Sequence, residues 1–330
     1  MNLKNSLVGC DNLENNLESK IPLIVVCGPT ASGKTGLGIQ LAKKYNGEVV
    51  SADSMQIYKG MDIATAKPTQ QEMEGITHHL ISYVNPTQSY SVADYVQEAH
   101  KVIKDIYSRG KTPMLVGGTG LYINSLVNNI EFGKENSNEE IRQQLYKKLE
   151  TQGAESLLEQ LAEFDPQSAQ RLGTGNHRRL VRAIEVYLTT GKTMTQHIEE
   201  SKLIPSPYND VRIGLSCENR ENLYNKINLR VDLMINQGLL DETEEFFKQS
   251  YSNTAVKAIG YKELEPYFKG TDTLENTIEC LKRETRRYAK RQLTWFRRDE
   301  KINWIFTDTM SKENVLQTAI SIIDNSGVLK

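Results

Sequence analysis

The fold is decided by one stretch of sequence, IPLIVVC at 21–27 followed by GPTASGKT at 28–35. The first part is a short apolar run of the kind that forms a buried strand, and a helical pattern follows from Lys34 to about Tyr45. The turn between them fits GxxxxGK[ST], with Gly28, Pro29, Thr30, Ala31, Ser32, Gly33, Lys34 and Thr35. After a strand and before a helix, this motif predicts a P-loop, in which backbone N–H groups surround phosphate oxygens.

Within this loop we expect Lys34 to contact the terminal phosphates and the Thr35 hydroxyl to bind Mg²⁺. Nucleoside triphosphates are the usual ligands, and they predict a second strand that ends in an Asp aimed at the metal. The next apolar run, 113–116, ends instead in Gly117-Gly118-Thr119, without a carboxylate. The acidic residue in the expected region is Asp53, just past the strand predicted at 48–51. An ordinary nucleotide hydrolase is therefore disfavoured.

Strand and helix patterns alternate away from the loop. Ser91 with Asp94 predicts a helix start, and Gly110 ends that helix. Strand character returns at 211–217 and 302–305, and the long helical region between them has its predicted breaks at Gly238, Gly260 and Gly270. The fold class predicted is α/β, a P-loop NTPase-like parallel sheet with flanking helices, interrupted by an all-helical insertion. The expected parts are a flexible extension at 1–20, core at 21–130, the insertion at 131–206 and core again at 207–330.

Composition sets limits on the class of protein. Hydrophobic residues make up 38% and charged residues 25%, with a net charge of −2, which describes an ordinary globular chain. No apolar run approaches the ~20 residues that span a bilayer, and no secretory signal is recognisable. The spacing of Cys10, Cys27, Cys217 and Cys280 fits neither zinc nor a small disulfide framework. We expect a cytoplasmic protein without a membrane partner. We do not expect a metal site at His78-His79, because adjacent residues rarely point at one ion.

A series of motifs resembles the tRNA dimethylallyltransferases, also called tRNA isopentenyltransferases. The resemblance starts at GPTASGKT and covers roughly residues 21–305 in the family's order. The further motifs are SADSMQIYKGMDIATAKP at 51–68, LVGGTGLY at 115–122, NHRRLVRAIEV at 176–186, TGK at 190–192, KAIGYKEL at 257–264 and TRRYAKRQLTWFR at 285–297. Several motifs in series are more specific than a P-loop alone.

This resemblance, of bacterial type, implies transfer of a dimethylallyl group from dimethylallyl diphosphate to the exocyclic amino group of adenosine 37. The acceptors would be tRNAs that read codons beginning with U. The loop would then hold a diphosphate leaving group with Mg²⁺, which explains the absent second carboxylate. By the same resemblance Asp53 is the general base, since a ring-delocalised amine needs help in losing its proton. On its own, Asp53 also fits a turn or helix cap.

An arginine is expected on the departing diphosphate, together with Lys34 and Thr35. The resemblance points to Arg220, although a solvated helix-start residue is the alternative. Six residues on, where relatives often have Arg, this chain has Lys226, which keeps the charge but loses the bidentate fork.

The resemblance also implies contacts with the anticodon stem-loop of tRNA. Thr119 is one of them, with a helix N-cap as the alternative role. The full set of expected tRNA-binding residues is Asp53, Ser54, Met55, Gln56, Thr119, Arg142, Arg178, Arg179, Leu180, Val181, Arg182, Lys257, Ala258, Ile259, Gly260, Tyr261 and Lys262.

A basic helix predicted at 282–298 adds to this footprint. It carries eight Lys and Arg residues against Glu284 alone, so the near-neutral total conceals a segregated charge distribution. At 100° per residue the basic side chains share one arc, and the residues in the opposite arc are Leu281, Thr285, Tyr288, Ala289, Gln292, Trp295 and Phe296. Such a face suits phosphate, or is simply solvated.

Three other functions remain open on the residues alone. They are an adenylate isopentenyltransferase acting on free AMP, ADP or ATP, a small-molecule P-loop kinase, and an RNA-binding module without activity. The insertion and its basic residues disfavour the first, because a free nucleotide needs no clamp for a stem-loop. We expect the protein to act as a monomer.

Overall fold

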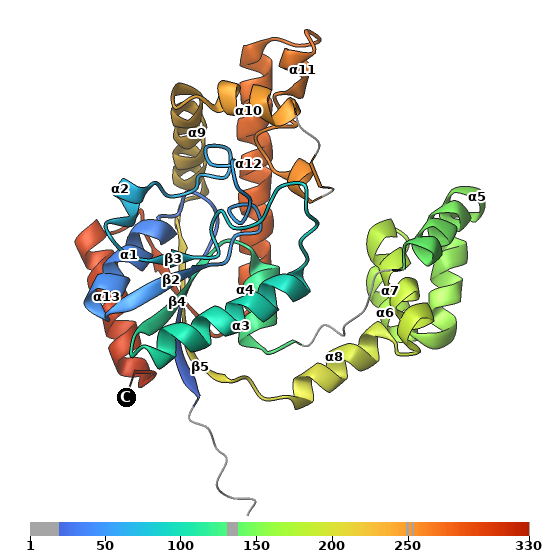
Figure 1. Ribbon diagram of the computed structural model, residues 1–330, viewed down its shortest axis with the longest axis horizontal. Helices are drawn as coiled ribbons and strands as arrows, with labels where there is room; N and C mark the ends of the chain where they lie inside the picture. The colour runs from blue at the N-terminus through green and yellow to red at the C-terminus, as the bar shows by residue number, and fades with distance from the viewer. Residues whose placement is uncertain (1–19, 131–137, 249–250, 253, 330) are drawn as a thin grey trace, which may run out of the picture. The chain divides into compact units, whose positions relative to one another are not determined.

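The computed structural model describes residues 20–130, 138–248, 251–252 and 254–329. Except for Lys20, the extension expected at 1–20 lies outside the described residues, as does the expected start of the insertion at 131. Six strands form one sheet in the order β3-β2-β4-β1-β5-β6, and all five neighbouring pairs are parallel (Figure 1). Their bounds are β1 Ile21–Cys27, β2 Gly47–Ser51, β3 His78–His79, β4 Thr112–Gly117, β5 Tyr208–Ser216 and β6 Ile302–Phe306. The predicted fold class is confirmed; the short β3 was not predicted.

The register brings the chemical motifs to one edge of the sheet. Cys27, the last residue of β1, lies level with Gly117 of β4 and Gly214 of β5. Ser51, the last residue of β2, is opposite Val116 of β4. The P-loop, the Asp53 loop and the Gly-Gly-Thr-Gly loop therefore all leave the sheet at its carboxyl edge, where ligands of open α/β sheets bind.

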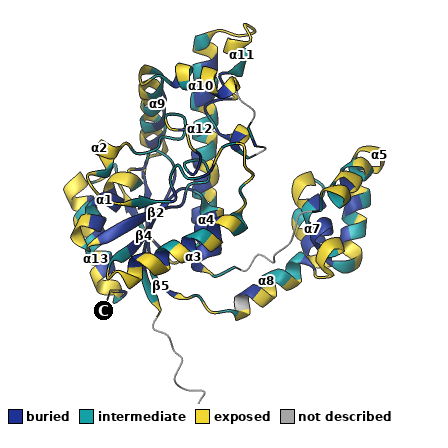
Figure 2. Cartoon of the chain, viewed as in Figure 1, coloured by how far each residue is buried: buried dark blue, intermediate teal, exposed yellow. Residues whose placement is uncertain are grey.

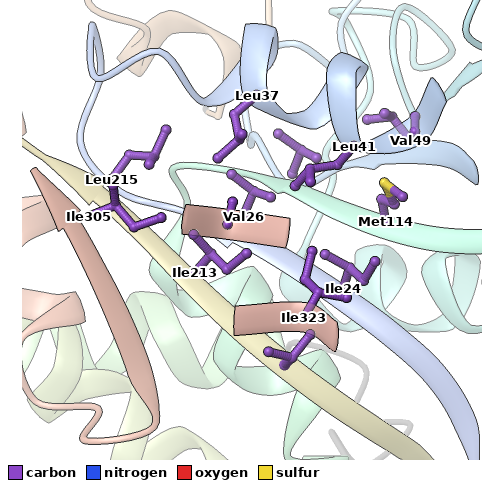
Figure 3. Close-up of a cluster of buried hydrophobic side chains, with 14 of the residues drawn as sticks. Ile24, Val26, Leu37, Leu41, Val49, Met114, Ile213, Leu215, Ile305 and Ile323 are labelled. Carbon is purple, nitrogen blue, oxygen red and sulfur yellow. The ribbon is translucent and has the colours of Figure 1, made fainter. Parts of the chain in front are cut away.

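One face of the sheet is covered by α1 (Lys34–Lys44) and α13 (Lys312–Ser326). Leu37 and Leu41 of α1 and Ile323 of α13 pack with Ile24 and Val26 of β1 in one buried cluster (Figure 3). These apolar side chains recur every second residue along β1 and every three to four along the helices, so each element presents one face to the cluster. This packing fixes the start of α1, and hence the P-loop.

The longer helix α3 (Val92–Ser108) contacts β2 and β4. Its start is as predicted, because Ser91 Oγ accepts from Asp94 N at 3.2 Å while Asp94 Oδ2 accepts from Ser91 N at 2.8 Å. Tyr95 from its first turn is buried and donates to Ser51 O at 3.0 Å. That bond anchors the end of β2, from which Asp53 follows.

Above the carboxyl edge stand the helices of the second core segment (Figure 1). They are α9 (Arg220–Asn236), α10 (Leu239–Phe247), α11 (Glu265–Phe268) and α12 (Leu274–Phe296), with a 3₁₀ turn at Ala255–Lys257. The breaks predicted at Gly238, Gly260 and Gly270 coincide with left-handed backbone, at φ values of 98°, 125° and 68°. The short helices α2 (Gln70–Met73) and α4 (Gly120–Val127) complete the core.

The chain divides into two compact units, one of 1–123 with 207–330 and one of 124–206. The second contains α5 (Glu139–Phe164), α6 (Pro166–Leu172), α7 (His177–Thr190) and α8 (Met194–Leu203), and its described part holds helices without a strand. It has its own core, formed around Leu157, Leu161, Leu180 and Ile184, which Figure 2 shows as buried inner faces. Among the described residues, no helix has the length and apolar character needed to cross a membrane.

Candidate active site

The P-loop takes a conformation that only some residues allow. Gly28 and Gly33 have φ values of 140° and 92°, and Ala31 is left-handed at 61°. A Cβ on Gly28 would clash with the carbonyl oxygen of Leu215 in β5, so this glycine is needed for the close approach of the two chains. The backbone conformation of the loop therefore explains why the motif has glycine at these positions.

The loop offers hydrogen-bond donors that no protein group uses. Among the described residues, the N–H groups of 31–35 have no acceptor, and the buried Ser32 hydroxyl has no partner. The first turn of α1 contributes the positive end of its helix dipole at the same place. An unfilled set of converging donors fits an anion with many acceptor oxygens, such as a diphosphate.

Lys34 begins α1 and lines a cavity beside the loop. Its Nζ donates to Pro29 O at 2.5 Å. Burial is the main cause that lowers the pKa of Lys34 to about 8, the positive charge of Arg230 lowers it further, and Asp53 acts in the opposite direction. Keeping Lys34 protonated therefore costs free energy, and an anionic ligand bound beside it would offset that free energy.

The cavity has a volume of about 310 Å³ and is lined entirely by the first unit. Its walls come from the P-loop, the loops after β2 and β4, α9, the 257–262 segment and α12. The polar and charged side chains among its lining residues are Thr30, Lys34, Thr35, Asp53, Ser54, Gln56, Thr65, Arg230, Lys257, Lys262, Thr285, Tyr288, Arg291 and Gln292. Ile227, Val231, Met234, Ile259 and Leu281 add apolar surface. A polar loop and an apolar wall in one cavity suit a substrate with a charged end and a hydrocarbon end.

Asp53 is half-buried in this cavity, and the structure shows its turn role as well. Its Oδ1 accepts from the N–H groups of Met55 at 2.9 Å and Gln56 at 3.3 Å. Its Oδ2 has no hydrogen-bond partner in the part of the chain that the structure describes. The backbone bonds fix the carboxylate while one oxygen stays available to accept a proton.

Thr119 was predicted to contact tRNA or to cap a helix. Its Oγ1 accepts from Ser54 N at 3.0 Å, and its own N–H donates to Ala52 O at 3.0 Å. It therefore ties the loop after β4 to both sides of Asp53. Ser54, Met55 and Gln56 line the cavity as a group.

The predicted 257–262 segment lies at the cavity except for Tyr261. Tyr261 is buried and donates to Glu242 Oε1 at 2.9 Å. Glu242 on α10 also accepts from the N–H groups of 62–64, at 2.7 to 2.9 Å. Tyr261 thus supports the loop wall at 62–66 from behind instead of facing the cavity. Gly260 packs against Ala64 of that loop, where a Cβ would approach to 2.7 Å.

The structure does not bring Arg220 to the cavity. It is the first residue of α9 and is exposed, while Lys226 donates to Thr307 Oγ1 at 3.2 Å outside the cavity lining. The arginine in place is Arg230, whose Nη1 donates to Thr30 Oγ1 at 3.2 Å and whose Nη2 donates to Ala66 O at 3.4 Å. Burial lowers the pKa of this guanidinium. Its sequence signal is a basic residue within the apolar stripe of Leu223, Ile227, Val231 and Met234.

In the helical unit, Arg142 and Arg182 meet at a buried carboxylate. Arg142 Nη2 lies 2.9 Å from Glu185 Oε1, and Arg182 Nη1 lies 3.1 Å from Glu185 Oε2. Arg178 and Arg179 are exposed at the start of α7. Leu180 and Val181 are instead core residues, so their side chains pack inside the unit. The tRNA contacts expected of those two side chains are replaced by a structural role.

The basic helix begins earlier than predicted, at Leu274, and its packing arc is as predicted. Leu281, Ala289, Gln292 and Phe296 are buried. Two half-buried basic residues are paired with α9 instead, because Lys282 pairs with Asp232 at 2.8 Å and Arg286 donates to Asn228 Oδ1 at 2.6 Å. The exposed members are Arg283, Arg287, Lys290, Arg291, Arg297 and Arg298. Gln292 is a site residue that the sequence reasoning placed only in the core.

His79 pairs with Glu48 at 2.7 Å, away from this site. Glu48 is buried at the start of β2, where Arg109 and Lys111 also hold it, and these partners lower its pKa well below the usual range. Within the described residues, no group of three or more His, Cys, Asp or Glu could hold a metal ion.

A P-loop on a parallel sheet, with a carboxylate and half-buried cations facing one cavity, is the arrangement of a P-loop enzyme. The particular family follows from comparison with known proteins. The model of the IPP transferase family matches residues 56–299, and the chain belongs to this family. The family predicted from the sequence motifs is confirmed.

Curated relatives agree with this assignment. The chain is 47% identical over 293 residues to the tRNA dimethylallyltransferase of Acetivibrio thermocellus, covering 88% of this chain and 93% of the relative. It is 48% identical over 287 residues to that of Bacillus subtilis, covering 87% and 91%.

Solved structures show the same fold. The tRNA isopentenylpyrophosphate transferase of Bacillus halodurans matches with a TM-score of 0.69 at 41% identity, covering 94% of this chain and 99% of that one. A eukaryotic dimethylallyltransferase acting on tRNA matches with a TM-score of 0.81 at 32% identity, covering 92% and 78%.

Proposed function

We propose that this chain transfers the dimethylallyl group of dimethylallyl diphosphate to the exocyclic amino group of adenosine 37 in tRNA. The acceptors are tRNAs that read codons beginning with U, and diphosphate is released. The observation that carries the proposal is the single cavity in which the donor-rich P-loop and the Asp53 carboxylate meet. The names of the relatives support this activity over transfer to free adenine nucleotides.

The residues divide the reaction into two tasks. The adenosine amino nitrogen attacks the allylic carbon, the carbon–oxygen bond to diphosphate breaks, and its electron pair leaves with the diphosphate. Asp53 takes the proton that the amino group loses. Lys34, Arg230 and the N–H groups of 31–35 stabilise the negative charge on the leaving group. We assign the diphosphate arginine to Arg230 in place of the exposed Arg220.

Magnesium fits this site through one protein ligand and the substrate. Thr35 is the second residue of α1 and follows directly on the unused donors of the loop. Mg²⁺ is commonly held by few protein oxygens together with phosphate oxygens. When bound, the ion would neutralise charge on the diphosphate.

The acceptor side uses basic and backbone groups. The exposed cations of α12 and the 257–262 segment supply phosphate-binding groups, and Arg178 and Arg179 of α7 present a second basic surface. The target adenine must leave its stack to reach Asp53, as in other enzymes that modify a base. We propose that the protein acts on tRNA in the cytoplasm as a monomer.

One experiment tests the proposed function. The protein is incubated with labelled dimethylallyl diphosphate, Mg²⁺ and either tRNA or AMP, and the product is digested to nucleosides. We expect label in adenosine 37 of tRNA only. Label in AMP alone would assign the chain to adenylate isopentenyltransferase activity, and label in neither acceptor would contradict a transferase.

A further inference from the structure

Gln292 lies at the junction of the two loops that carry the site. It projects from α12, is 6% exposed, and accepts from Thr30 N on the P-loop through Oε1 at 2.9 Å. Its Nε2 donates to Gly118 O, in the loop after β4, at 2.9 Å. One side-chain amide therefore satisfies two backbone groups, one in the loop that follows β1 and one in the loop that follows β4.

The loop after β4 is shaped to receive this helix. A Cβ on Gly118 would clash with Gln292 Nε2, and a Cβ on Gly120 would clash with the indole of Trp295. Because neither glycine has a side chain, α12 can pack closely against this loop. The Gly-Gly-Thr-Gly sequence is therefore required for the packing of the helix as well as for the turn. Gln292 and Trp295 are three residues apart and thus lie on the same face of α12.

The chemistry of the bridge restricts the residue. A carboxamide offers a neutral acceptor and a neutral donor on one planar group, and Asn, the other carboxamide, is shorter by one methylene. An acidic residue would face the Gly118 carbonyl with a second acceptor and would repel a diphosphate. Because the Gly118 carbonyl is buried and the Thr30 N–H is partly buried, losing the amide leaves both groups without this partner.

Thr30 is consequently held from two sides. Gln292 takes its N–H, and Arg230 donates to its hydroxyl at 3.2 Å. The peptide planes that follow, at 31–35, keep their N–H groups free for a ligand. With the Thr30 end of the loop fixed, those N–H groups are oriented before the diphosphate binds, which lowers the entropy cost of binding.

We propose that Gln292 is a positioning residue that presets the P-loop for diphosphate and thereby makes α12 part of the donor site. The reaction it serves rests on the proposed function. The same helix presents Lys290 to solvent two residues away, on the opposite side. One helix thus carries the donor loop on its inner face and a basic surface for RNA on its outer face.

The test compares three full-length variants, Gln292→Met, Gln292→Glu and Lys290→Met. Binding of inorganic diphosphate with Mg²⁺ is measured by calorimetry, and KM values for dimethylallyl diphosphate and tRNA are measured in the transfer reaction. We expect Gln292→Met to weaken diphosphate binding and raise the KM for dimethylallyl diphosphate about tenfold, with the KM for tRNA within about twofold of wild type. Lys290→Met should show the reverse pattern.

Unchanged diphosphate affinity in Gln292→Met overturns the inference, as does an equal loss of affinity for diphosphate and tRNA. If the Met variant does not fold, Gln292→Glu decides, because it keeps the size and an acceptor for Thr30; wild-type affinity for diphosphate in it contradicts the role. Failure of the wild type to transfer the dimethylallyl group would sink the proposed function instead, while the calorimetry would still decide the role of Gln292.

Discussion

Arg230 on α9 donates from Nη1 to Thr30 Oγ1 at 3.2 Å, so a half-buried cation from the second core segment contacts the P-loop of the first. The two residues are 200 positions apart. The contact joins the diphosphate loop to the wall of the cavity, and it assigns a function to an arginine that motif spacing did not single out.

The first prediction concerns this arginine. Arg230→Ala should lower the single-turnover rate of transfer by about 100-fold, because a desolvated cation on the leaving group is lost. Arg230→Lys should recover part of the rate, since it restores the charge without the planar fork. Arg220→Ala should have a smaller effect, as Arg220 is exposed and outside the cavity lining. A larger loss at Arg220 than at Arg230 would reverse the assignment.

The second prediction follows from the lowered pKa of Lys34. With a pKa of about 8, Lys34 is charged below that pH and neutral above it in the free protein. Affinity for inorganic diphosphate should therefore fall as the pH rises through about 8, beyond any change from the ligand's own ionisation. Calorimetry between pH 6.5 and 9.5 checks this, at values chosen to bracket the transition by about 1.5 units. Lys34→Arg stays charged across the range, and an equally steep fall in that variant would contradict the role of Lys34.

Much of the fold follows from local patterns in the sequence. The P-loop motif, the capping pair of Ser91 and Asp94, and the glycine breaks each depend on residues near one another in the chain, so all were predictable. The strand at His78–His79 was not, because two residues carry no periodicity and the strand exists only through its pairing with β2.

The residues of the candidate site also fall into those set by local sequence and those set by distant packing. Lys34, Thr35 and Asp53 belong to continuous motifs that reach the cavity together. Arg230 and Gln292 reach it through the packing of α9 and α12, which depends on distant segments. For both Arg230 and Gln292, the available sequence signal was a polar residue within an apolar helical stripe. For Leu180 and Val181, in contrast, membership of the apolar stripe indicated that their side chains belong to the core. Helical periodicity would have separated these roles more sharply than motif membership.

The third prediction tests the base. Asp53→Asn keeps an oxygen that can accept from Met55 and Gln56, so the loop should hold its shape. Transfer should fall by about 100-fold or more because the amide cannot take the proton. The dissociation constant for tRNA should change by less than about threefold. Parallel losses in binding and turnover would show that Asp53 serves the fold of the loop and not proton transfer.

The fourth prediction concerns the support of the cavity wall. Glu242 accepts from three successive backbone N–H groups and from Tyr261. Glu242→Ala should lower the free energy of unfolding by about 3 kcal/mol, since these donors lose a charged acceptor. Glu244→Ala on the exposed face of the same helix is the matched control and should stay within about 0.5 kcal/mol. Denaturant unfolding measures both, and similar values for the two variants would remove Glu242 as the anchor of the loop.

The last prediction separates the two kinds of cation on α12. Arg297 is exposed, whereas Lys282 is half-buried and pairs with Asp232 at 2.8 Å, a bond that raises the pKa of Lys282. If α12 meets tRNA phosphates, Arg297→Ala should weaken tRNA binding and reduce the slope of log affinity against log salt by about 1. Lys282→Ala should leave that slope unchanged and lower the stability, because Asp232 loses its partner. Filter binding across a salt series distinguishes the two, and an unchanged slope in Arg297→Ala and in Arg298→Ala would place the tRNA on another surface.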